Sequence, residues 1–570
     1  MSYLSARKRK ENINFYAMES FWDREEKKRK KKQVFLGSCL KGRCVFNKSA
    51  LDFANLFRGT QWEREYWNWR ELSQINETND IVVAQQDILD ADDRRAGVSL
   101  VLDSVERELG LRDCLQAVFN SSTVNKILSL AYFCATGSRR SLNYASVWTK
   151  DHYLPGDETE GISEAGINRL LALIDASQIL QFQTLWLKKF PKEQRLSLDI
   201  TSVSTYSKNI TDAMRGYNRD RENLEQINLL LLVGQTNKLP LWFEQLPGAI
   251  SDITTIKDTV KLLTDIDNTS KDIVFDRGFA SAENIACLQK NGIKFTMGIP
   301  LERFSWVVGE IQKAVKQYAF SRPEGSMQMF DEASVMQSSA ITINKKINGH
   351  RAYLHLYNCN YYRVESENRL AAQIQEVYEL LCHEKPLKTD GQKAIAEQCF
   401  IVKKTPVRGL SVKSIPENIE KFKNSLSGYF AILSNSLKDP YDAMYVYKLR
   451  DGIEKRFDDL KNEEDMRRLR VHSAHNMQAR LFIQFIAEIL RCGVLKKLQD
   501  LAQSERREQF KKLRNMTVTE LLSEVDSLRR IRIANHQAFY KRPTLTQREI
   551  LTIFGVNMTG AKWPGLNKIL

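Results

Sequence analysis

Residues 196–207, LSLDITSVSTYS, begin the part of the chain that decides its fold. Apolar and β-branched residues alternate in this stretch, which is typical of a β-strand. Two more strand patterns follow, INLLLLVGQ at 227–235 and LPLWFEQL at 239–246, with the turn-prone residues TNK between them. This region is therefore expected to begin with a meander of three strands.

Helices and strands alternate after the meander. Helical spacing in TTIKDTVKLLTDI at 254–266 is followed by the short apolar strand KDIVFD at 271–276. The helix pattern SAENIACLQKNG at 281–292 closes with a glycine, and the strand pattern IKFTMGI at 293–299 comes next. The order β-β-β-α-β-α-β predicts a mixed sheet in which the first and fourth strands lie side by side and parallel.

The length and charge of the chain restrict the class of protein to which it can belong. At 570 residues and 65.9 kDa it exceeds one ordinary domain, and roughly three to four domains are expected. Its composition is that of a folded globular protein, with 42% hydrophobic and 27% charged residues. A net charge of +15 favours an acidic partner such as nucleic acid.

Two basic or aromatic segments lie near the start. Residues 7–32 carry RKRK and KKRKKK, which predicts a solvated, extended tail; phosphate contact and a localisation signal are the alternatives. Residues 60–70, TQWEREYWNWR, interleave aromatic residues with arginines. Such residues can stack on bases, but core packing is the favoured interpretation because large aromatic side chains are usually buried.

Compartment and membrane signals point the same way. The nine cysteines are scattered without a C-x-x-C pair, as expected for reduced thiols in a cytoplasm. The first residues lack the apolar segment of a secretory signal, and no apolar stretch approaches the roughly 18 to 20 residues of a membrane span. We expect a cytoplasmic protein without a membrane partner.

The segment YDAMYVYKLRDGIEKRFDDLKN at 441–462 carries an unusual set of polar residues. On one continuous helix the positions of Tyr447, Arg450, Glu454 and Lys461 would lie within about 60° of one another. That face would present a phenol, a guanidinium, a carboxylate and an ammonium in a row. The alternative is an exposed helix face with i, i+4 charge pairs and no function.

Two other carboxylates strengthen the functional interpretation. Asp199 lies within the first predicted strand and Asp276 ends the fourth, so both are expected near the carboxyl-end region of the sheet. A charge in an apolar strand is unfavourable unless it is paired or binds a metal. If Glu454 joins them, the expected occupant is a pair of Mg²⁺ ions, with Mn²⁺ as an expected substitute.

These residues resemble a known family. Asp, Asp and Glu on this scaffold resemble the ribonuclease-H-like DDE transposases of bacterial insertion sequences. The spacing Tyr-x2-Arg-x3-Glu-x6-Lys at 447–461 is similar to the signature of their insertion sequence four superfamily. The stretches VFDRGFAS at 274–281 and RVHSAHNMQARLFIQFIAEIL at 470–490 agree with the branch that has long β insertions, and the resemblance covers roughly residues 190–495.

The resemblance implies residue roles. It makes Asp199, Asp276 and Glu454 the catalytic metal ligands, while Tyr447, Arg450 and Lys461 would bind DNA phosphates near the cleaved end. Guanidinium, ammonium and phenol groups suit these contacts.

Two further residues are weaker candidates for DNA binding. Arg277 follows Asp276, and it is either a nearby phosphate contact or a surface arginine of a turn. Trp306 is the one tryptophan between Asp276 and Glu454. Some family members hold a flipped base on such a residue, but core packing is the favoured interpretation for Trp306.

The implied function is a cut-and-paste transposase. It would cleave the phosphodiester at each end of an insertion sequence by metal-dependent hydrolysis and join the 3′-OH ends to target DNA. The implied partners are transposon-end DNA, target DNA and a second copy in a synaptic complex, in the bacterial cytoplasm and at the nucleoid. No motif supports a nucleotide cofactor. A DNA nuclease without strand transfer and a catalytically silent DNA-binding repressor are the alternatives.

The predicted fold is therefore an α/β, ribonuclease-H-like mixed sheet with helical ends, interrupted by an insertion. The NG pair at 348–349 predicts a hairpin in that insertion, and all-round apolarity predicts a buried helix at 481–490. The predicted regions are a basic N-terminal region at 1–97, a helical and possibly DNA-binding domain at 98–190, the catalytic core at 191–300 and 431–495, a β-rich insertion domain at 301–430, and a helical C-terminal region at 496–570.

Overall fold

The protein was studied as a computed structural model, which carries side chains. It describes residues 2–9, 12–23, 28–40, 43–67, 90–137, 140–156, 161–190, 195–216, 218, 222–249, 256, 272–317, 320, 338–406, 409–422, 426–462, 468–469, 473–533 and 538–556.

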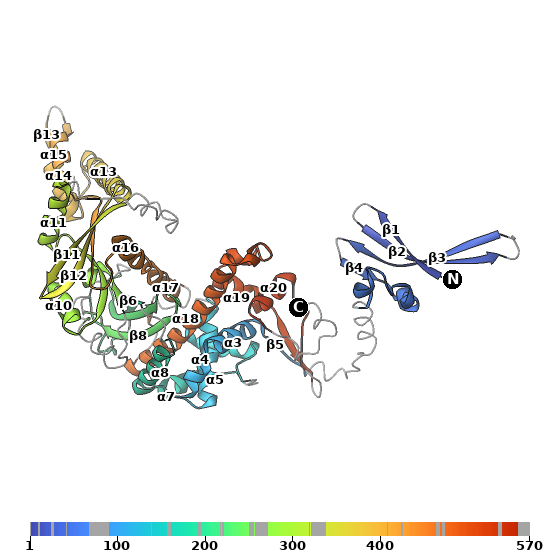
Figure 1. Cartoon of the computed structure of the whole chain (residues 1–570). Coiled ribbons are helices and arrows are strands. Elements are labelled where there is room, and N and C mark those ends of the chain that lie inside the picture. Colours follow the sequence, from blue (N-terminus) through green and yellow to red (C-terminus); the bar gives the residue numbers. More distant parts are fainter. Residues whose placement is uncertain are drawn as a thin grey trace.

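Strands from the middle of the sequence form a mixed sheet, which lies at the left of Figure 1. Its first five strands in sequence are β6 (Arg195–Thr205), β7 (Glu225–Gly234), β8 (Pro240–Pro247), β9 (Asp272–Phe275) and β10 (Lys294–Ile299). They lie in the order β8-β7-β6-β9-β10. Strand β6 pairs in parallel with β9 and antiparallel with β7, so the predicted neighbours are confirmed, as is the α/β, ribonuclease-H-like class.

The local signals of this region act as predicted where the structure describes them. Helix α10 (Ala282–Lys290) begins after Ser281, whose hydroxyl accepts a hydrogen bond from the Asn284 backbone N–H. It ends before Gly292, which has a positive φ of 67° that glycine adopts without strain. The helix predicted at 254–266 lies outside the described residues apart from Ile256.

The insertion is not the predicted β-rich domain. Its hairpin, β11 (Ser338–Ile347) and β12 (His350–Cys359), turns through Asn348 and Gly349, both at positive φ, as the sequence predicts. This hairpin does not form a sheet of its own. Through β15 (Tyr429–Ser434) it extends the central sheet beyond β10.

Helices make up much of the remaining insertion, which corrects the predicted β-rich composition. A small core that includes Val377, Ile395 and Phe400 explains why they form, because apolar residues of α13 and α14 recur at helical spacing. The elements are α11 (Ser305–Lys316), α13 (Asn360–Cys382), α14 (Asp390–Cys399), β13 (Phe400–Thr405), β14 (Gly409–Ser414) and α15 (Pro416–Phe422).

Helices from both sides of the central sheet in the sequence pack into one core. The apolar segment 481–490 lies within the long helix α18 (Ala474–Gln503), and all ten residues are buried, as predicted. The residues expected to be helical at 98–190 form α3 (Gly97–Leu109), α4 (Leu111–Gln116), α5 (Ser121–Ala135), η2 (Leu142–Tyr144), α6 (Ala145–Asp151), α7 (Glu164–Leu173) and α8 (Ala176–Lys188).

The C-terminal region is not purely helical. A small antiparallel sheet joins it to the start of the helical region, since β17 (Arg529–Arg532) pairs with both β5 (Asp92–Arg95) and β18 (Phe539–Tyr540). The other elements after α18 are η5 (Glu505–Glu508), η6 (Leu513–Asn515), α19 (Val518–Asp526) and α20 (Leu545–Ile553), and the two-residue strand β16 (Arg468–Leu469) pairs with β6.

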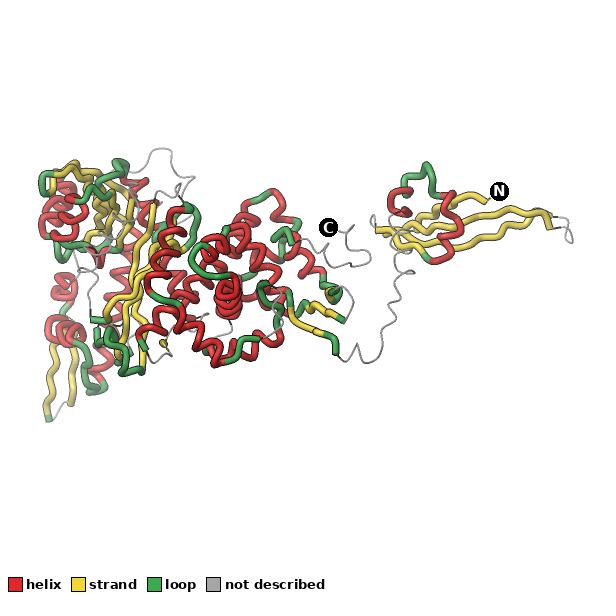
Figure 2. Tube along the Cα trace, turned by 90° about the horizontal axis from the view of Figure 1, so that it is seen from below, coloured by secondary structure: helices red, strands yellow, loops and turns green. Residues whose placement is uncertain are grey.

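The N-terminal residues form a sheet, so the prediction of a solvated, extended tail is wrong. The antiparallel sheet has the order β1-β2-β3-β4, and its strands form a group of their own beside the N-terminus (Figure 2). They are β1 (Ser2–Arg9), β2 (Asn12–Asp23), β3 (Lys28–Leu40) and β4 (Arg43–Phe46), followed by η1 (Lys48–Leu56). The basic run at 28–32 begins β3, where it pairs with the end of β2, and the apolar residues Val34 and Leu36 farther along the strand reach the core.

That N-terminal core contains the aromatic segment of residues 60–70. Tyr66 is fully buried against Phe57, with 4.2 Å between ring centroids, and Trp62 and Trp67 pack at its edge. Core packing is thus confirmed for these three, whereas Trp69 and Arg70 lie outside the described residues. One thiol prediction is corrected, because Cys39 and Cys44 face each other across β3 and β4 and form a disulfide.

The length and apolarity of the described helices bear on the prediction that the chain has no membrane span. No single one of them is both long and apolar enough to cross a bilayer. Together α7 and α8 reach that length and apolarity, but a bend of 75° separates them and each buries residues in the common core.

A buried ion pair holds α17 (Asp451–Asn462) against α18. Arg456 Nη1 lies 3.2 Å from Glu488 Oε1, and Glu488 is fully buried. Burial raises the pKa of Glu488 above its ordinary value, although Arg456 opposes this effect. The thiol of Cys492 donates a further hydrogen bond to the same carboxylate oxygen at 3.2 Å. This pair fixes the helix that carries Glu454.

Replacing Arg456 with Met should therefore destabilise the protein by about 3 to 5 kcal/mol, since it leaves a buried carboxylate without its partner. Thermal unfolding followed by circular dichroism measures this loss. Lys455→Met, at an exposed position of the same helix, is the matched control and should unfold like the wild type. Equal midpoints for both variants would show that the pair does not anchor α17.

Candidate active site

Asp199 is a carboxylate in the middle of a buried strand. It is the fifth of eleven residues of β6, its exposed fraction is 1%, and the backbone N–H of Ile200 donates a hydrogen bond to its Oδ1 at 2.8 Å. Asp199 therefore lies within the strand, as predicted, and β6 continues beyond it to Thr205.

Asp276 lies beside Asp199 because of the register of the two parallel strands. Leu198 of β6 pairs with Phe275, the last residue of β9, so the next residue of each strand is an aspartate at the same level. Asp276 then begins the short helix η3 (Arg277–Phe279). The two aspartates lie together because β9 is short. Asp199 is inside its strand, whereas Asp276 follows the last residue of its strand.

One guanidinium contacts all three predicted carboxylates. Arg450 Nη1 lies 3.7 Å from Asp199 Oδ2 and 3.0 Å from Glu454 Oε1, and Nη2 lies 3.6 Å from Asp276 Oδ1. Burial would lower the pKa of Arg450, but the surrounding acidic groups, Asp276 most of all, raise it above its ordinary value. The sequence therefore brings Asp199, Asp276, Glu454 and Arg450 into one site.

The helix that carries these residues is broken, which corrects the predicted single helical face. Helix α16 (Pro440–Lys448) ends before Arg450, and α17 begins at Asp451. Backbone hydrogen bonds that span three residues, such as Ile453 N–H to Arg450 C=O at 2.8 Å, tighten the chain between them. Arg450 lies in this turn, from which it reaches both aspartates.

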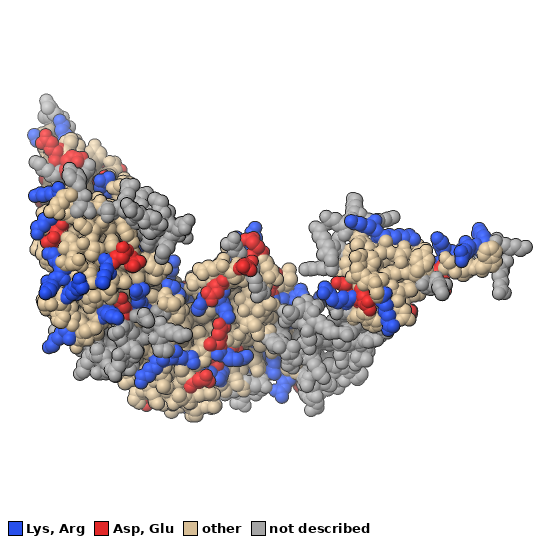
Figure 3. Space-filling model, viewed as in Figure 1, with Lys and Arg blue, Asp and Glu red and all other residues tan. Residues whose placement is uncertain are grey.

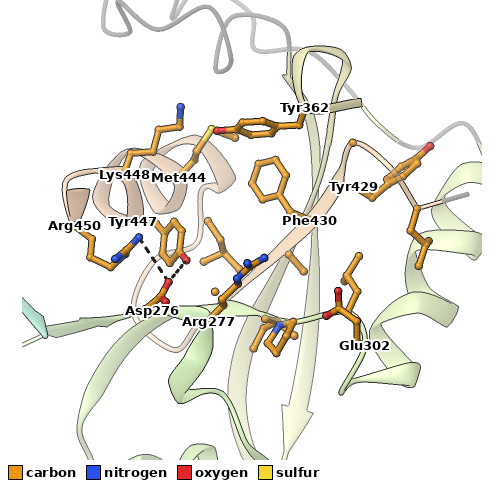
Figure 4. A pocket seen from close by; sticks show the side chains of 18 of the residues that line it. Asp276, Arg277, Glu302, Tyr362, Tyr429, Phe430, Met444, Tyr447, Lys448 and Arg450 are labelled. Carbon is orange, nitrogen blue, oxygen red and sulfur yellow. Dashed lines mark hydrogen bonds and ion pairs between the residues drawn. The ribbon is translucent and has the colours of Figure 1, made fainter. Parts of the chain in front are cut away.

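Tyr447 connects α16 to the fourth strand. Its hydroxyl donates a hydrogen bond to Asp276 Oδ1 at 3.2 Å (Figure 4). Burial, followed by the charge of Asp276, raises the pKa of the Tyr447 phenol well above its usual range, so it stays a donor at neutral pH. Gly298 of β10 permits this approach, since a Cβ at that position would lie 2.5 Å from the phenol oxygen. Sequence reasoning missed Gly298.

A cavity of about 670 Å³ opens beside the carboxylates. Asp276, Arg277, Tyr447, Arg450 and Glu454 line it on the side of the catalytic elements. The insertion supplies the other side, where Figure 4 shows Tyr362, Tyr429 and Phe430 around the same space, with Glu302 below them. These aromatic residues were not predicted, because their place depends on how the insertion extends the sheet.

Of the predicted DNA-binding residues Arg277, Lys461 and Trp306, only Arg277 is among the described residues that line this cavity. Arg277 is exposed and lines it. Lys461 lies in the last turn of α17, and Trp306 on α11 is 36% exposed, with Lys345 Nζ 5.1 Å from its ring centroid. Neither Lys461 nor Trp306 is among the described residues that line the cavity.

The donor set was compared with what a metal ion requires. Within the described ranges, no three Asp, Glu, His or Cys side chains lie close enough to one another to share one ion. The carboxylates instead surround the Arg450 guanidinium, which carries the charge that a bound cation would supply. All three side chains supply hard oxygen donors, which are the ligands that a divalent metal prefers. The donor types therefore fit such an ion, while the present arrangement places them around Arg450.

Comparisons with known proteins identify the family. The model of the family described as "Transposase DDE domain" matches residues 190–490, more than half of the chain. The chain belongs to this family. It is therefore a DDE transposase, and the matched residues include Asp199, Asp276, Glu454, Tyr447 and Arg450.

Two other comparisons add little to the family assignment. No curated protein sequence matches this transposase. Among solved structures, it is similar to one described as "Cryo-EM structure of piggyBac transposase synaptic complex with hairpin DNA (SNHP)", at 12% identity and a TM-score of 0.33. The match covers 75% of this chain and 76% of that chain, and similarity at this level supports no inference.

The contact between Gly298 and Tyr447 gives a test of the site. Gly298→Ala should destabilise the transposase by about 1 to 3 kcal/mol, because the new methyl group overlaps the phenol. Thermal unfolding is the measurement. Gly309→Ala on α11 is the control, since a Cβ there meets nothing within 4 Å.

A double variant identifies the cause. If the overlap with the ring is responsible, Gly298→Ala should lower the unfolding midpoint much less in a Tyr447→Ala background. The same drop in both backgrounds would contradict the proposed packing.

Proposed function

We propose that this transposase cleaves the ends of an insertion sequence by metal-dependent phosphodiester hydrolysis and joins the resulting 3′-OH ends to target DNA. One observation carries the proposal. Three carboxylates from β6, the end of β9 and α17 contact a single guanidinium beside an open cavity. In a chain of this family, such a constellation is the best candidate for the cleavage site.

The finer family assignment belongs to the proposal as well. The residues of the spacing Tyr-x2-Arg-x3-Glu-x6-Lys favour the insertion sequence four superfamily. Tyr447, Arg450 and Glu454 support this assignment because each contacts another catalytic residue.

Asp199, Asp276 and Glu454 would hold Mg²⁺, for which Mn²⁺ could substitute. When bound, such ions supply positive charge that activates the attacking oxygen and stabilises the leaving one. The protein's contribution is to hold three acidic groups together, and Arg450 neutralises them in the meantime.

Arg450 can exchange partners when DNA enters. Its guanidinium can pair bidentately with a phosphate, and it already lies at the wall of the cavity. Moving Arg450 onto a DNA phosphate would release the carboxylates from their ion pairs. Tyr447 would keep Asp276 oriented throughout, because its phenol remains protonated and donates to Oδ1.

The cavity offers further contacts for a DNA end. Arg277 and Lys448 add positive charge near its walls. Tyr362 and Phe430 provide aromatic faces against which an unpaired base can stack, whereas Trp306 lies elsewhere on α11. Lys461 would bind phosphate beyond the cavity, farther along α17.

The partners follow from the reaction. Transposon-end DNA and target DNA are the substrates, and two ends call for two active sites, which a homodimer in a synaptic complex would supply. The expected location is the bacterial cytoplasm, at the nucleoid while DNA is bound.

Glu454→Gln tests the catalytic assignment. The variant removes an anionic ligand but keeps the shape of the side chain, so cleavage of element ends should fall at least about 100-fold while end binding persists. Cleavage of a labelled duplex that carries the DNA flanking the coding region is the measurement. Glu302→Gln, across the same cavity, is the matched control.

The products of the same assay separate the alternatives. A transposase joins cut ends to a supercoiled target, whereas a nuclease gives cleaved ends without joined product. A silent repressor binds the ends and cuts neither strand. Unchanged cleavage by Glu454→Gln would remove this residue from the active site.

A further inference from the structure

The N-terminal sheet has one face that its own core does not cover. Strand residues alternate between faces, and Leu4, Phe15 and Val34 turn toward the small aromatic core. The opposite positions form what we name the open face. It consists of Tyr3, Ser5 and Arg7 on β1, Asn14, Tyr16, Met18, Ser20 and Trp22 on β2, and Arg29, Lys31, Gln33 and Phe35 on β3.

The register of the strands establishes this face. Tyr16 lies opposite Phe35, and their rings pack 5.4 Å apart. Trp22 lies opposite Arg29, and the Arg7 guanidinium lies 5.0 Å from the Tyr16 ring centroid. Aromatic and cationic side chains therefore share one face of three neighbouring strands.

Three of the four aromatic side chains of the open face are exposed, whereas Tyr16 is half-buried and its neighbour Met18 is buried. Trp22 is 61% exposed, Tyr3 48% and Phe35 44%. Such large apolar groups gathered on one surface mark an interaction site more often than chance exposure. Their stacking faces suit a planar or apolar partner.

The charge of the open face selects an anionic partner. Its described positions carry the cations Arg7, Arg29 and Lys31 and hold no Asp or Glu, whereas on the other face the lysines share the surface with Glu19, which lies opposite Lys32. Figure 3 shows Lys and Arg side chains along this N-terminal unit, including the region of the hairpin of β2 and β3. Charge complementarity therefore points to a polyanion.

The dimensions favour duplex DNA among polyanions. Three strands at about 4.8 Å spacing make a sheet roughly 10 Å wide, which fits a major groove of about 12 Å. Strands as long as β2 and β3 extend roughly 40 Å, which is close to one turn of B-DNA at about 34 to 36 Å.

We infer that the open face binds duplex DNA at the element ends, with β1, β2 and β3 laid along the major groove. Arg7, Arg29 and Lys31 contact phosphates, and Trp22 and Phe35 pack against sugars and base edges. This inference rests on the proposed function for the identity of the DNA. It assigns end recognition to the described residues of β1, β2 and β3, away from the catalytic cavity.

The test measures DNA affinity of the full-length protein. The probe is a fluorescein-labelled duplex that carries the DNA flanking the coding region, titrated at several salt concentrations. Arg29→Ala/Lys31→Ala should weaken binding at least about tenfold and reduce the slope of log affinity against log salt by about 2. Trp22→Ala should weaken binding without changing that slope.

The matched control is Lys8→Ala/Lys32→Ala. It removes the same charge from β1 and β3, but from exposed positions on the other face. Its effect should be small, and circular dichroism should show wild-type folding for all variants. Equal weakening by both double variants, or by neither, would overturn the inference, as would tighter binding of a single strand or of anionic vesicles than of the duplex.

Failure of the inference and failure of the proposed function give different results. Asp276→Asn in the catalytic site should leave duplex affinity at the wild-type value while it abolishes cleavage. If wild-type protein binds through the open face but never cuts, the proposed function fails alone. If it cuts and joins while open-face variants bind normally, only the inference fails.

Discussion

The parallel pairing of β6 with β9 is the constraint on which the site depends. Because Leu198 pairs with Phe275, the next residues place two aspartates side by side at the centre of the sheet. Two neighbouring carboxylates, of which Asp199 is fully buried and Asp276 half-buried, repel each other and are stabilised by a cation. Arg450 meets that need in the described structure, and in the proposed function a divalent ion would meet it.

The rest of the fold keeps the third carboxylate and the cavity in place. The buried pair of Arg456 and Glu488 fixes α17 on α18, and Glu454 lies on α17. The insertion contributes through β15 and α13, which bring Phe430 and Tyr362 to the cavity opposite the carboxylates. An insertion that extends the sheet thus also completes the cavity.

The sequence predicts the parts whose signals are local. Alternation in LSLDITSVSTYS and the N-G turn at 348–349 identified strands and a hairpin, and motif spacing identified the residues around Arg450. It did not predict the break before α17, because the Val446 carbonyl there accepts a hydrogen bond from the distant Gln235 side chain at 2.9 Å while the Arg450 N–H donates to Tyr447. The N-terminal sheet was missed for a related reason, since lysine runs hide the alternate apolar residues that build its core.

The central claim is that Asp199, Asp276 and Glu454 act as one ligand set. Titration of the transposase bound to cut element-end DNA with Mn²⁺, followed by electron paramagnetic resonance, tests it directly. The account predicts about two bound ions per active site in the wild type and a loss of bound ions in Asp199→Asn. Equal Mn²⁺ binding by the two proteins would contradict it.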